Sequence, residues 1–432
     1  MSKQTGHVII GASAAGIAAG EAIRADDAKT PITVISDEVH GPYSRCLLSY
    51  YLAGRRPKKD LWIRGDGYYR ENRILALPGR KAVRLDTGRK TVLLENGEEI
   101  PYRTLLLATG GKPQFPSIPG VDAAGVLGMR TLDDVEKMIE LAGEAGDAVI
   151  LGGGLIGCKA AYGLRERGLK ITIAIGSNRV LSQMLDLKAA GIFRTLFEDH
   201  GITISTGMKA REIITEKNAV VGVAFENGEI IPCRMVVVGK GVDPRIELAR
   251  GTSITTDRGI LVDNHLATTA EDVYAAGDAA QAPGLFGTEK LVNSLWPVAM
   301  EQGRIAGRNM AGREEVYPGS LGMNSIDFYG TEVIAAGKVT GLTDDHEVVT
   351  CDHSRRGVYK KLVLKDTVPV GLILVGEIDS AGVIISLIKE GAHVGRLKDA
   401  LLGRHFGFGR AGGVMGPGAR DDFPSLKLLN TL

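Results

Sequence analysis

Two glycine-rich loops of the same design constrain this chain more than any other feature of its sequence. The first, Gly11-Ala12-Ser13-Ala14-Ala15-Gly16, follows the apolar run 7–10, and the second, Gly152-Gly153-Gly154-Leu155-Ile156-Gly157, follows the run 147–151. Each leads into a segment with helical periodicity and then into another strand-like run. Such a turn aims unpaired amide groups and the positive end of a helix at a pyrophosphate. Two copies predict an α/β chain with two nucleotide sites.

Composition excludes several other classes of protein. The 432 residues include 52 basic and 51 acidic side chains, which argues against nucleic acid or an anionic membrane as a standing partner. No apolar run approaches the roughly 20 residues of a membrane span, and the first residues lack the pattern of a secretory signal. Four cysteines without CxxC spacing predict neither a metal site nor a disulfide framework. We therefore expect a cytoplasmic protein.

Further polar and small residues follow other predicted strands. The acidic pair Asp37-Glu38 follows the strand 32–36, where a carboxylate could hold a ribose hydroxyl, although either residue alone could equally be part of a solvated loop. The turn Ala108-Thr109-Gly110 ends a second apolar run, and Gly277-Asp278 ends a third. Small residues there let the backbone approach a flat ligand, and Asp278 can accept a hydrogen bond from a polyol. Together with the glycine loops, these turns are hard to explain as strand-end packing alone.

The second glycine loop leaves the choice between NAD and NADP open. The residues after its second strand, 175–178, include no carboxylate for a ribose hydroxyl and no basic residue for a 2′-phosphate. Arg179 is close by in the sequence, and we expect it to fix the local loop.

These motifs, in this order, resemble those of the two-dinucleotide-binding flavoproteins, also called the pyridine nucleotide–disulfide oxidoreductases. The resemblance covers residues 5 to about 390. It implies two Rossmann-like domains, one inserted in the other, and a C-terminal α+β domain that forms an interface or dimer contact. FAD would bind to residues 1–112 and 247–318, NAD(P)H to 113–246, and the interface domain would comprise 319–432.

The resemblance also implies which residues contact the two cofactors. Those for FAD are Gly11, Ser13, Ala14, Ala15, Gly16, Asp37, Glu38, Arg45, Val83, Ala108, Thr109, Gly110, Gly277, Asp278 and Gln302. Those for NAD(H) or NADP(H), with NAD favoured, are Gly152, Gly154, Leu155, Ile156 and Gly157. Two positions depart from the family. Lys159 replaces the usual glutamate beside the nicotinamide, and Leu155 replaces an aromatic gate of the oxidase branch.

Cys46 separates two branches of the family. Without a CxxxxC or CxxC pair, the two-thiol mechanism of the disulfide reductases has no residues to carry it. Cys46 aligns with the single redox cysteine of coenzyme A-disulfide reductases and NADH oxidases, where a thiolate beside Arg45 could attack a disulfide. The surrounding segment 42–50 more closely resembles rubredoxin and ferredoxin reductase-like members, in which this position only packs near the flavin. Ala14 also stands where the oxidase branch has histidine.

The leading hypothesis is therefore an enzyme that transfers electrons between NAD(P)H and a protein redox partner. The segment 322–330 and the glycine-rich tail 406–418 resemble the flavoprotein subunits of phenylglyoxylate dehydrogenase-type complexes. This implies rubredoxin, a ferredoxin or an iron–sulfur subunit as partner, and a homodimer or a subunit of a hetero-oligomer. The alternatives are a thiol reductase or oxidase acting through Cys46 and a non-catalytic, flavin- or nucleotide-sensing subunit.

Overall fold

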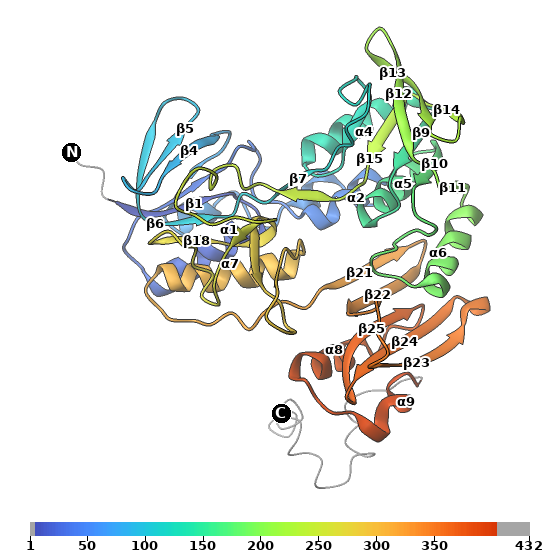
Figure 1. Ribbon diagram of the computed structural model, residues 1–432. Coiled ribbons are helices and arrows are strands. Elements are labelled where there is room, and N and C mark those ends of the chain that lie inside the picture. The colour runs from blue at the N-terminus through green and yellow to red at the C-terminus, as the bar shows by residue number, and fades with distance from the viewer. Residues whose placement is uncertain (1–4, 404–432) are drawn as a thin grey trace. The chain divides into compact units, whose positions relative to one another are not determined.

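The computed structural model describes residues 5–403, which divide into two compact units (Figure 1). The first contains the residues up to Pro116 together with 127–144 and 241–320, and the second contains 117–126, 145–240 and the residues from Leu321 onward. The predicted glycine-rich tail 406–418 lies outside the described residues. Within residues 5–403, no helix has the length and apolar character needed to cross a lipid bilayer.

The first unit is built on a mainly parallel sheet with strand order β3-β2-β1-β6-β5-β4, and β18 also pairs with β6. Its helices and strands are β1 (Gly6–Ile10), α1 (Ala14–Asp26), β2 (Ile32–Ile35), α2 (Leu48–Leu52), α3 (Tyr68–Glu71), β3 (Ile74–Leu77), β4 (Ala82–Asp86), β5 (Thr91–Leu94), β6 (Glu99–Leu107), β7 (Gly111–Pro113), α4 (Leu132–Ala145), β16 (Val242–Pro244), β17 (Ile260–Leu261), β18 (Val273–Ala275), β19 (Ala280–Pro283), β20 (Lys290–Leu291) and α7 (Trp296–Met310). Short 3₁₀ helices are η1 (Arg45–Leu47), η2 (Lys58–Leu61) and η3 (Gly277–Ala279). The strand β8 (Val126–Gly128) lies where the chain passes from the second unit to the first.

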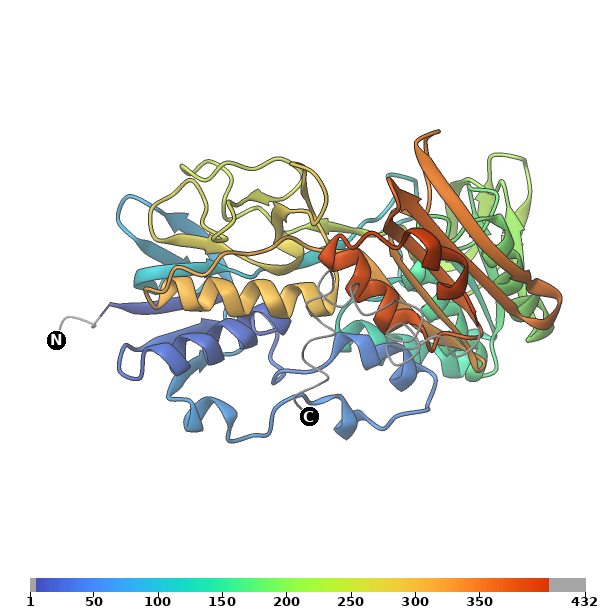
Figure 2. The same ribbon diagram turned by 90° about the horizontal axis from the view of Figure 1, so that it is seen from below.

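Helices α1 and α7 pack closely beside this sheet, and Figure 2 shows them lying along each other. Glycine makes this approach possible. A Cβ at Gly303 of α7 would lie 2.1 Å from the Ala15 carbonyl oxygen of α1, and one at Gly307 would lie 2.5 Å from that of Ala19. The central strand β1 and the second half of β6 are apolar and buried, as expected for parallel strands covered on both faces.

A hairpin turn and a pair of short strands complete this unit. Asn96-Gly97 forms the turn between the antiparallel strands β5 and β6, and Gly97 has φ 86°. The proline-containing strands β7 and β16 pair antiparallel with each other.

The second unit repeats the parallel βαβ design and adds two antiparallel sheets. Its helices and strands are β9 (Asp147–Leu151), α5 (Leu155–Glu166), β10 (Lys170–Ile175), α6 (Leu187–Asp199), β11 (Ile202–Thr206), β12 (Ala210–Glu216), β13 (Ala219–Phe225), β14 (Ile230–Pro232), β15 (Met235–Val238), β21 (Met323–Phe328), β22 (Thr331–Gly337), β23 (His346–His353), β24 (Val358–Lys365), β25 (Val368–Val375), α8 (Ala381–Glu390) and α9 (Lys398–Leu401). The 3₁₀ helices are η4 (Ser354–Arg356) and η5 (Gly395–Leu397).

Its parallel strands follow the order β11-β10-β9-β15. Its two antiparallel sheets have the strand orders β12-β13-β14 and β21-β22-β25-β24-β23. An aromatic cluster joins α5 and α6 to the end of β21. The rings of Phe197 and Phe328 lie 5.1 Å apart, and those of Tyr162 and Tyr329 lie 5.0 Å apart. The Asp186 side chain adds a polar contact, because it accepts hydrogen bonds from Ala189 N in the first turn of α6 and from the Tyr359 hydroxyl of β24.

The α/β fold class, with an α+β C-terminal part, is confirmed. The helices after both glycine loops begin within the loops. The first helical residue is Ala14 in α1 and Leu155 in α5. Ser13 and Gly154 are the N-cap residues, so the helical turns begin inside the loops.

Candidate functional site

Three turns of the first unit meet at the carboxyl edge of its parallel sheet. Backbone hydrogen bonds join them: Gly11 N donates to Ile35 O (2.8 Å), Ala108 N to Ile10 O (2.9 Å) and Ala276 N to Leu107 O (3.2 Å). The first glycine loop, the turn 108–110 and the turn 277–278 therefore lie together, although they are far apart in the sequence. Ligands of open α/β sheets bind at this edge.

The first glycine loop has the shape that a pyrophosphate requires. Gly11 has φ 117°, and a Cβ there would lie 2.1 Å from the Ala108 carbonyl oxygen. A Cβ at Gly16 would lie 1.8 Å from the Gly11 carbonyl oxygen. Ser13 caps α1 without a side-chain capping bond, and the first helical residues, Ala14 and Ala15, are buried and carry no charge. The loop thus directs the amide end of a 13-residue helix outward, as an anion site needs.

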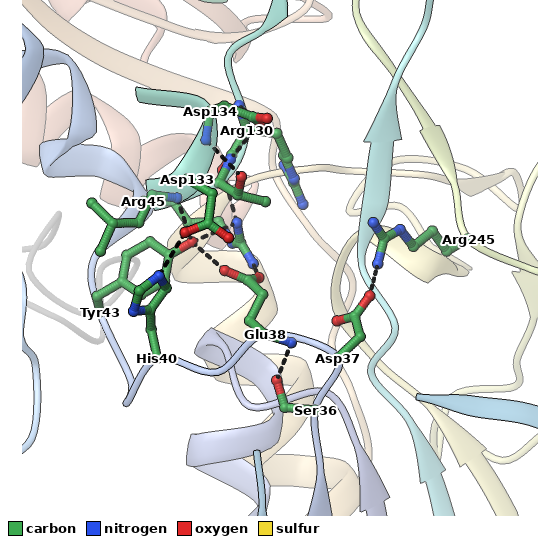
Figure 3. A network of polar contacts seen from close by, with 12 residues as sticks. Ser36, Asp37, Glu38, His40, Tyr43, Arg45, Arg130, Asp133, Asp134 and Arg245 are labelled. Atoms are coloured by element: carbon green, nitrogen blue, oxygen red, sulfur yellow. Dashed lines mark hydrogen bonds and ion pairs between the residues drawn. The ribbon is translucent and has the colours of Figure 1, made fainter. Parts of the chain in front are cut away.

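The two candidate carboxylates after β2 have different partners (Figure 3). Asp37 forms an ion pair with Arg245, with 2.8 Å between Oδ2 and Nη1. Glu38 accepts hydrogen bonds from the Tyr43 hydroxyl and from the Arg45 guanidinium. Burial raises the pKa of Tyr43 well above its usual range, so its hydroxyl stays protonated and keeps donating to Glu38. Arg45 therefore lies in the predicted region and orients Glu38.

Arg130 is a functional candidate that the sequence did not indicate. Its guanidinium lies 2.7 Å from Asp278 Oδ2, and a Cβ at Gly110 would lie 3.5 Å from its Nη2. Its carbonyl oxygen also accepts a hydrogen bond from Arg45 Nη1 (2.7 Å). Arg130 thus links three segments predicted to hold FAD. No glycine motif surrounds it, and it lies within the range 113–246 that the sequence assigned to NAD(P)H.

A capping box positions Arg130 at the start of α4. The Asp134 carboxylate accepts from the backbone nitrogens of Arg130 (2.9 Å) and Thr131 (2.8 Å), and the Thr131 hydroxyl accepts from Asp134 N (3.1 Å). The Thr-x-x-Asp spacing of such a box is readable from sequence. It could have indicated the helix start, but not the contact with Asp278.

The remaining residues predicted for FAD are Gln302, Thr109 and Val83, and the first two form hydrogen bonds with neighbouring turns. Gln302 is buried, accepts from Gly277 N (2.8 Å) and donates to the Tyr317 hydroxyl (3.2 Å), so it fixes the turn 277–278. The Thr109 hydroxyl donates to Arg245 O (2.6 Å). Val83 lies on β4, where the register with β5 shifts, and is 45% exposed.

The second glycine loop, in the second unit, repeats the geometry of the first. Gly152 has φ 120°, and a Cβ at Gly157 would lie 2.0 Å from the Gly152 carbonyl oxygen. A Cβ at Gly154 would meet nothing closer than Gly239 O at 3.7 Å. The space in front of Gly154 and the first helical residues, Leu155 and Ile156, therefore suits a ligand.

Arg179 fixes the neighbouring loop, as the sequence predicted. Its guanidinium donates to the carbonyl oxygens of Leu185 (3.1 Å) and Ser182 (3.2 Å) and to Asn178 Oδ1 (3.2 Å).

The cysteines occupy contrasting environments. Cys46 lies on η1 beside Arg45 and is exposed. Cys158 is buried, and burial raises its pKa to about 12. Burial also raises the pKa of Cys233 to about 12.

One group in the described part of the chain could hold a metal ion. Ligand atoms of His40, Asp133 and Glu136 lie within 4.8 Å of one another. Lys58 already forms an ion pair with Glu136, so a cation there would have to displace an ammonium group. Histidine spacing in the sequence gave no sign of this group, because the helix α4 supplies two of its members.

Comparisons with known proteins agree with this geometry. The family model of the pyridine nucleotide-disulphide oxidoreductases matches residues 5–303, and that of the rubredoxin NAD⁺ reductase C-terminal domain matches 323–392. The chain is 34% identical over 412 residues to the NADH-dependent phenylglyoxylate dehydrogenase subunit epsilon of Aromatoleum evansii, covering 94% of this chain and 97% of that protein.

Two further relatives extend the comparison. The NADH-rubredoxin oxidoreductase of Clostridium acetobutylicum is 28% identical, over 88% of this chain and 96% of that protein. The crystal structure of a ferredoxin reductase from Rhodopseudomonas palustris superposes with a TM-score of 0.80 at 27% identity, over 87% of this chain and 91% of the other. The chain belongs to the pyridine nucleotide-disulphide oxidoreductase family and is an FAD-dependent oxidoreductase that uses NAD(P)H.

Proposed function

We propose that this protein transfers electrons from NADH, through bound FAD, to a rubredoxin, a ferredoxin or an iron–sulfur subunit of a larger complex. The observation that carries this proposal is the pair of glycine loops, one in each unit, in a sequence that has neither a CxxC nor a CxxxxC thiol pair. FAD accepts a hydride as an electron pair and can release single electrons, which matches a one-electron iron centre. The relatives' names point to the same class of partner.

The residues of the first unit support a specific assignment for FAD. Amide groups of the loop from Gly11 to Gly16 would bind the pyrophosphate, and the Ser13 hydroxyl would add a donor. Glu38, oriented by Arg45 and Tyr43, would accept from the adenosine ribose, because Asp37 is already paired with Arg245. Arg130 and Asp278 would hold the polar chain between the phosphates and the ring.

The loop from Gly152 to Gly157 would bind the pyrophosphate of NADH. NADH is favoured over NADPH because the Arg179 guanidinium is committed to three local acceptors. The NADH-dependent enzyme of Aromatoleum evansii supports the same choice. As part of the proposal, the FAD domain comprises 1–112 and 247–318 with Arg130 added, the NAD domain 113–246 and the interface domain 319–432.

We also propose a cytoplasmic protein that forms a homodimer or joins a hetero-oligomer. The four cysteines all lie within residues 5–403 and form no disulfide there, which fits a reducing compartment. The match to an epsilon subunit over nearly its whole length supports assembly with other subunits.

Anaerobic titration tests the proposed function. The purified protein should carry FAD, NADH should bleach it rapidly and NADPH slowly, and rubredoxin or ferredoxin should restore its colour. A colourless protein that cannot be reconstituted with FAD would refute the proposal. Flavin that NADH leaves oxidised would instead indicate a sensing subunit.

A Cys46→Ser variant tests the thiol alternative. Cys46 is exposed and follows Arg45, which donates a hydrogen bond to Glu38, so a small disulfide or peroxide could reach its thiol. Full turnover with the protein acceptor in this variant would eliminate coenzyme A-disulfide or peroxide chemistry at Cys46. If the variant lost turnover while NADH still reduced its flavin, the result would favour thiol chemistry at Cys46.

A further inference from the structure

An exposed basic segment follows α2 in the first unit. Residues 54–60, with the sequence Gly-Arg-Arg-Pro-Lys-Lys-Asp, are exposed throughout. Over residues 55–73 the chain carries seven basic and three acidic side chains, whereas the whole chain is nearly balanced with a formal net charge of +1. Positive charge is therefore concentrated on this segment.

An aromatic side chain lies at the end of this segment. Trp62 is 38% exposed, and its ring centroid lies 6.3 Å from that of Tyr43 and 6.4 Å from that of His40. His40 Nε2 lies 2.7 Å from Asp133 Oδ1 on α4. An ion pair between Lys58 and Glu136 fixes the basic segment to the same helix.

These contacts join His40, Lys58 and Trp62, and the exposed residues Arg56 and Lys59 flank Lys58 in the chain. We call these five residues the docking surface. Arg56 remains 60% exposed despite lying 3.7 Å from Asp60. Protein interfaces favour an aromatic anchor such as tryptophan with arginine nearby and a polar rim around it. The composition of this surface is of that kind.

Backbone bonds place the docking surface beside the proposed FAD site. Ser44 N donates to Leu61 O (2.8 Å), and Ile63 N donates to Pro42 O (3.0 Å), so Trp62 and Tyr43 form a short antiparallel bridge. Tyr43 is 5% exposed and donates to Glu38 (Figure 3). A protein resting on Trp62 would lie one bridged segment away from the Glu38–Tyr43–Arg45 network.

We propose that the docking surface binds the acidic face of a small iron–sulfur protein, which receives its electrons there; this proposal rests on the proposed function. Cationic rims accelerate the encounter with acidic partners, and a buried aromatic anchor lengthens the lifetime of the complex. Each NADH supplies two electrons. Two partner molecules, each reduced by one electron at its iron, complete one turnover and leave NAD⁺ and a proton.

A charge-reversal variant of the full-length, FAD-loaded protein tests the docking surface. Rubredoxin and a [2Fe–2S] ferredoxin serve separately as acceptors, and menadione serves as an uncharged small acceptor. For Arg56→Glu/Lys59→Glu we expect kcat/KM for the iron–sulfur acceptor to fall about 10-fold at low salt. The difference should vanish near about 0.5 M NaCl, where charges are screened. Menadione reduction should stay unchanged.

Lys81→Glu/Arg84→Glu is the matched control, because it makes the same charge change at exposed positions at or beside β4. Figure 1 shows β4 and α2 at opposite ends of the first unit. A second pair of variants tests the anchor without changing charge: Trp62→Ser should lower kcat/KM at every salt concentration, and Trp62→Phe should retain most of it.

Two results would overturn the docking surface: iron–sulfur reduction by Arg56→Glu/Lys59→Glu equal to that of the wild type at low salt, or an equal loss in the control variant. The proposed function fails in a different way. A wild-type enzyme that reduces menadione with NADH but neither iron–sulfur protein would refute the protein partner itself, and the docking surface with it.

Discussion

At the scale of single residues, His7 places an ionisable ring at the centre of the first parallel sheet. It is 1% exposed, its Nδ1 lies 2.7 Å from Thr104 Oγ1, and burial lowers its pKa below the ordinary 6.5, which Asp27 only partly counters. The unfolded chain therefore binds a proton near pH 6.5 that the folded protein excludes. Since the unfolded state then binds more protons, the free energy of unfolding falls as the pH drops below about 6.5.

We expect His7→Gln to remove this pH dependence. Urea unfolding between about pH 8 and pH 5 should show the wild type losing up to about 1.4 kcal/mol per pH unit more than the variant below its unfolded pKa. Parallel pH profiles for the two proteins would mean that folded His7 takes up its proton as readily as unfolded His7, which would contradict a lowered pKa.

Arg130 offers a second test at this scale. Arg130→Gln removes the 2.7 Å ion pair with Asp278, in which the two side chains are only 20% and 12% exposed. The Asp278 carboxylate then lacks its partner among the turns proposed to hold FAD, so FAD affinity should fall by about 10- to 100-fold, or about 1–3 kcal/mol. Fluorescence titration of the deflavinated protein with FAD measures this change.

Arg89→Gln is the control for Arg130, because it breaks an exposed ion pair with Glu99 on the same unit. Surface pairs of this kind contribute little. Equal FAD affinity in both variants would remove Arg130 from the site.

At the scale of elements, the close contact between α1 and α7 depends on glycines, which have no side chain. A Cβ at Gly303 would lie 2.1 Å from the Ala15 carbonyl oxygen, which is backbone and cannot move aside cheaply. Gly303→Ala should therefore destabilise the protein by about 2–3 kcal/mol. Gly143 lies inside α4, and a Cβ there would meet nothing within 4 Å, so Gly143→Ala should stabilise by about 0.5–1 kcal/mol. Thermal unfolding measures both, and the same sign for the two variants would contradict the packing argument.

A substitution in the second glycine loop can test ligand binding without disturbing the fold. A methyl group at Gly154 would meet no protein atom closer than 3.7 Å, and the residue has φ −74°, so Gly154→Ala should fold normally. The same methyl group would intrude on a pyrophosphate at the loop, so the KM for NADH should rise about 10-fold while flavin content stays constant. An unchanged KM would place NADH elsewhere.

Gly157→Ala is the structural counterpart of that variant. Its Cβ would lie 2.0 Å from the Gly152 carbonyl oxygen, so loss of stability should accompany any loss of NADH binding.

At the scale of the whole molecule, a buried polar cluster serves the second unit alone. The Lys361 ammonium group is mostly buried, lies 3.2 Å from Asp186 Oδ2 and donates to Val339 O (3.1 Å). Burial alone would raise the pKa of Asp186, but hydrogen bonds from Ala189 N and Tyr359 and the Lys361 charge lower it. Asp186 therefore stays ionised beneath β24.

We expect Lys361→Ala to destabilise this unit by about 3 kcal/mol, because it leaves a shielded carboxylate without its cation. Both tryptophans, Trp62 and Trp296, belong to the first unit, so their fluorescence reports that unit. Circular dichroism should show an earlier transition than tryptophan and flavin fluorescence in the variant. Coincident transitions would mean that the two units unfold together.

Local patterns were sufficient to predict both glycine-rich turns between strand and helix and the α/β class. These features follow from glycine geometry and from hydrophobic periodicity, which act over a few residues. Local patterns suggested a domain boundary near residue 113 but did not indicate that 127–144 pack with the first unit. That choice is made by long-range contacts such as Arg130 with Asp278.

The sequence by itself determined the two tight turns after β1 and β9, because a turn that needs φ near 120° and no Cβ admits only glycine at Gly11 and Gly152. Only the tertiary structure decided how the two adjacent carboxylates after β2 are paired. It pairs Asp37 with Arg245, 208 residues away, and leaves Glu38 between Tyr43 and Arg45. Pairings over such separations depend on how sheets and helices pack, and no local pattern records them.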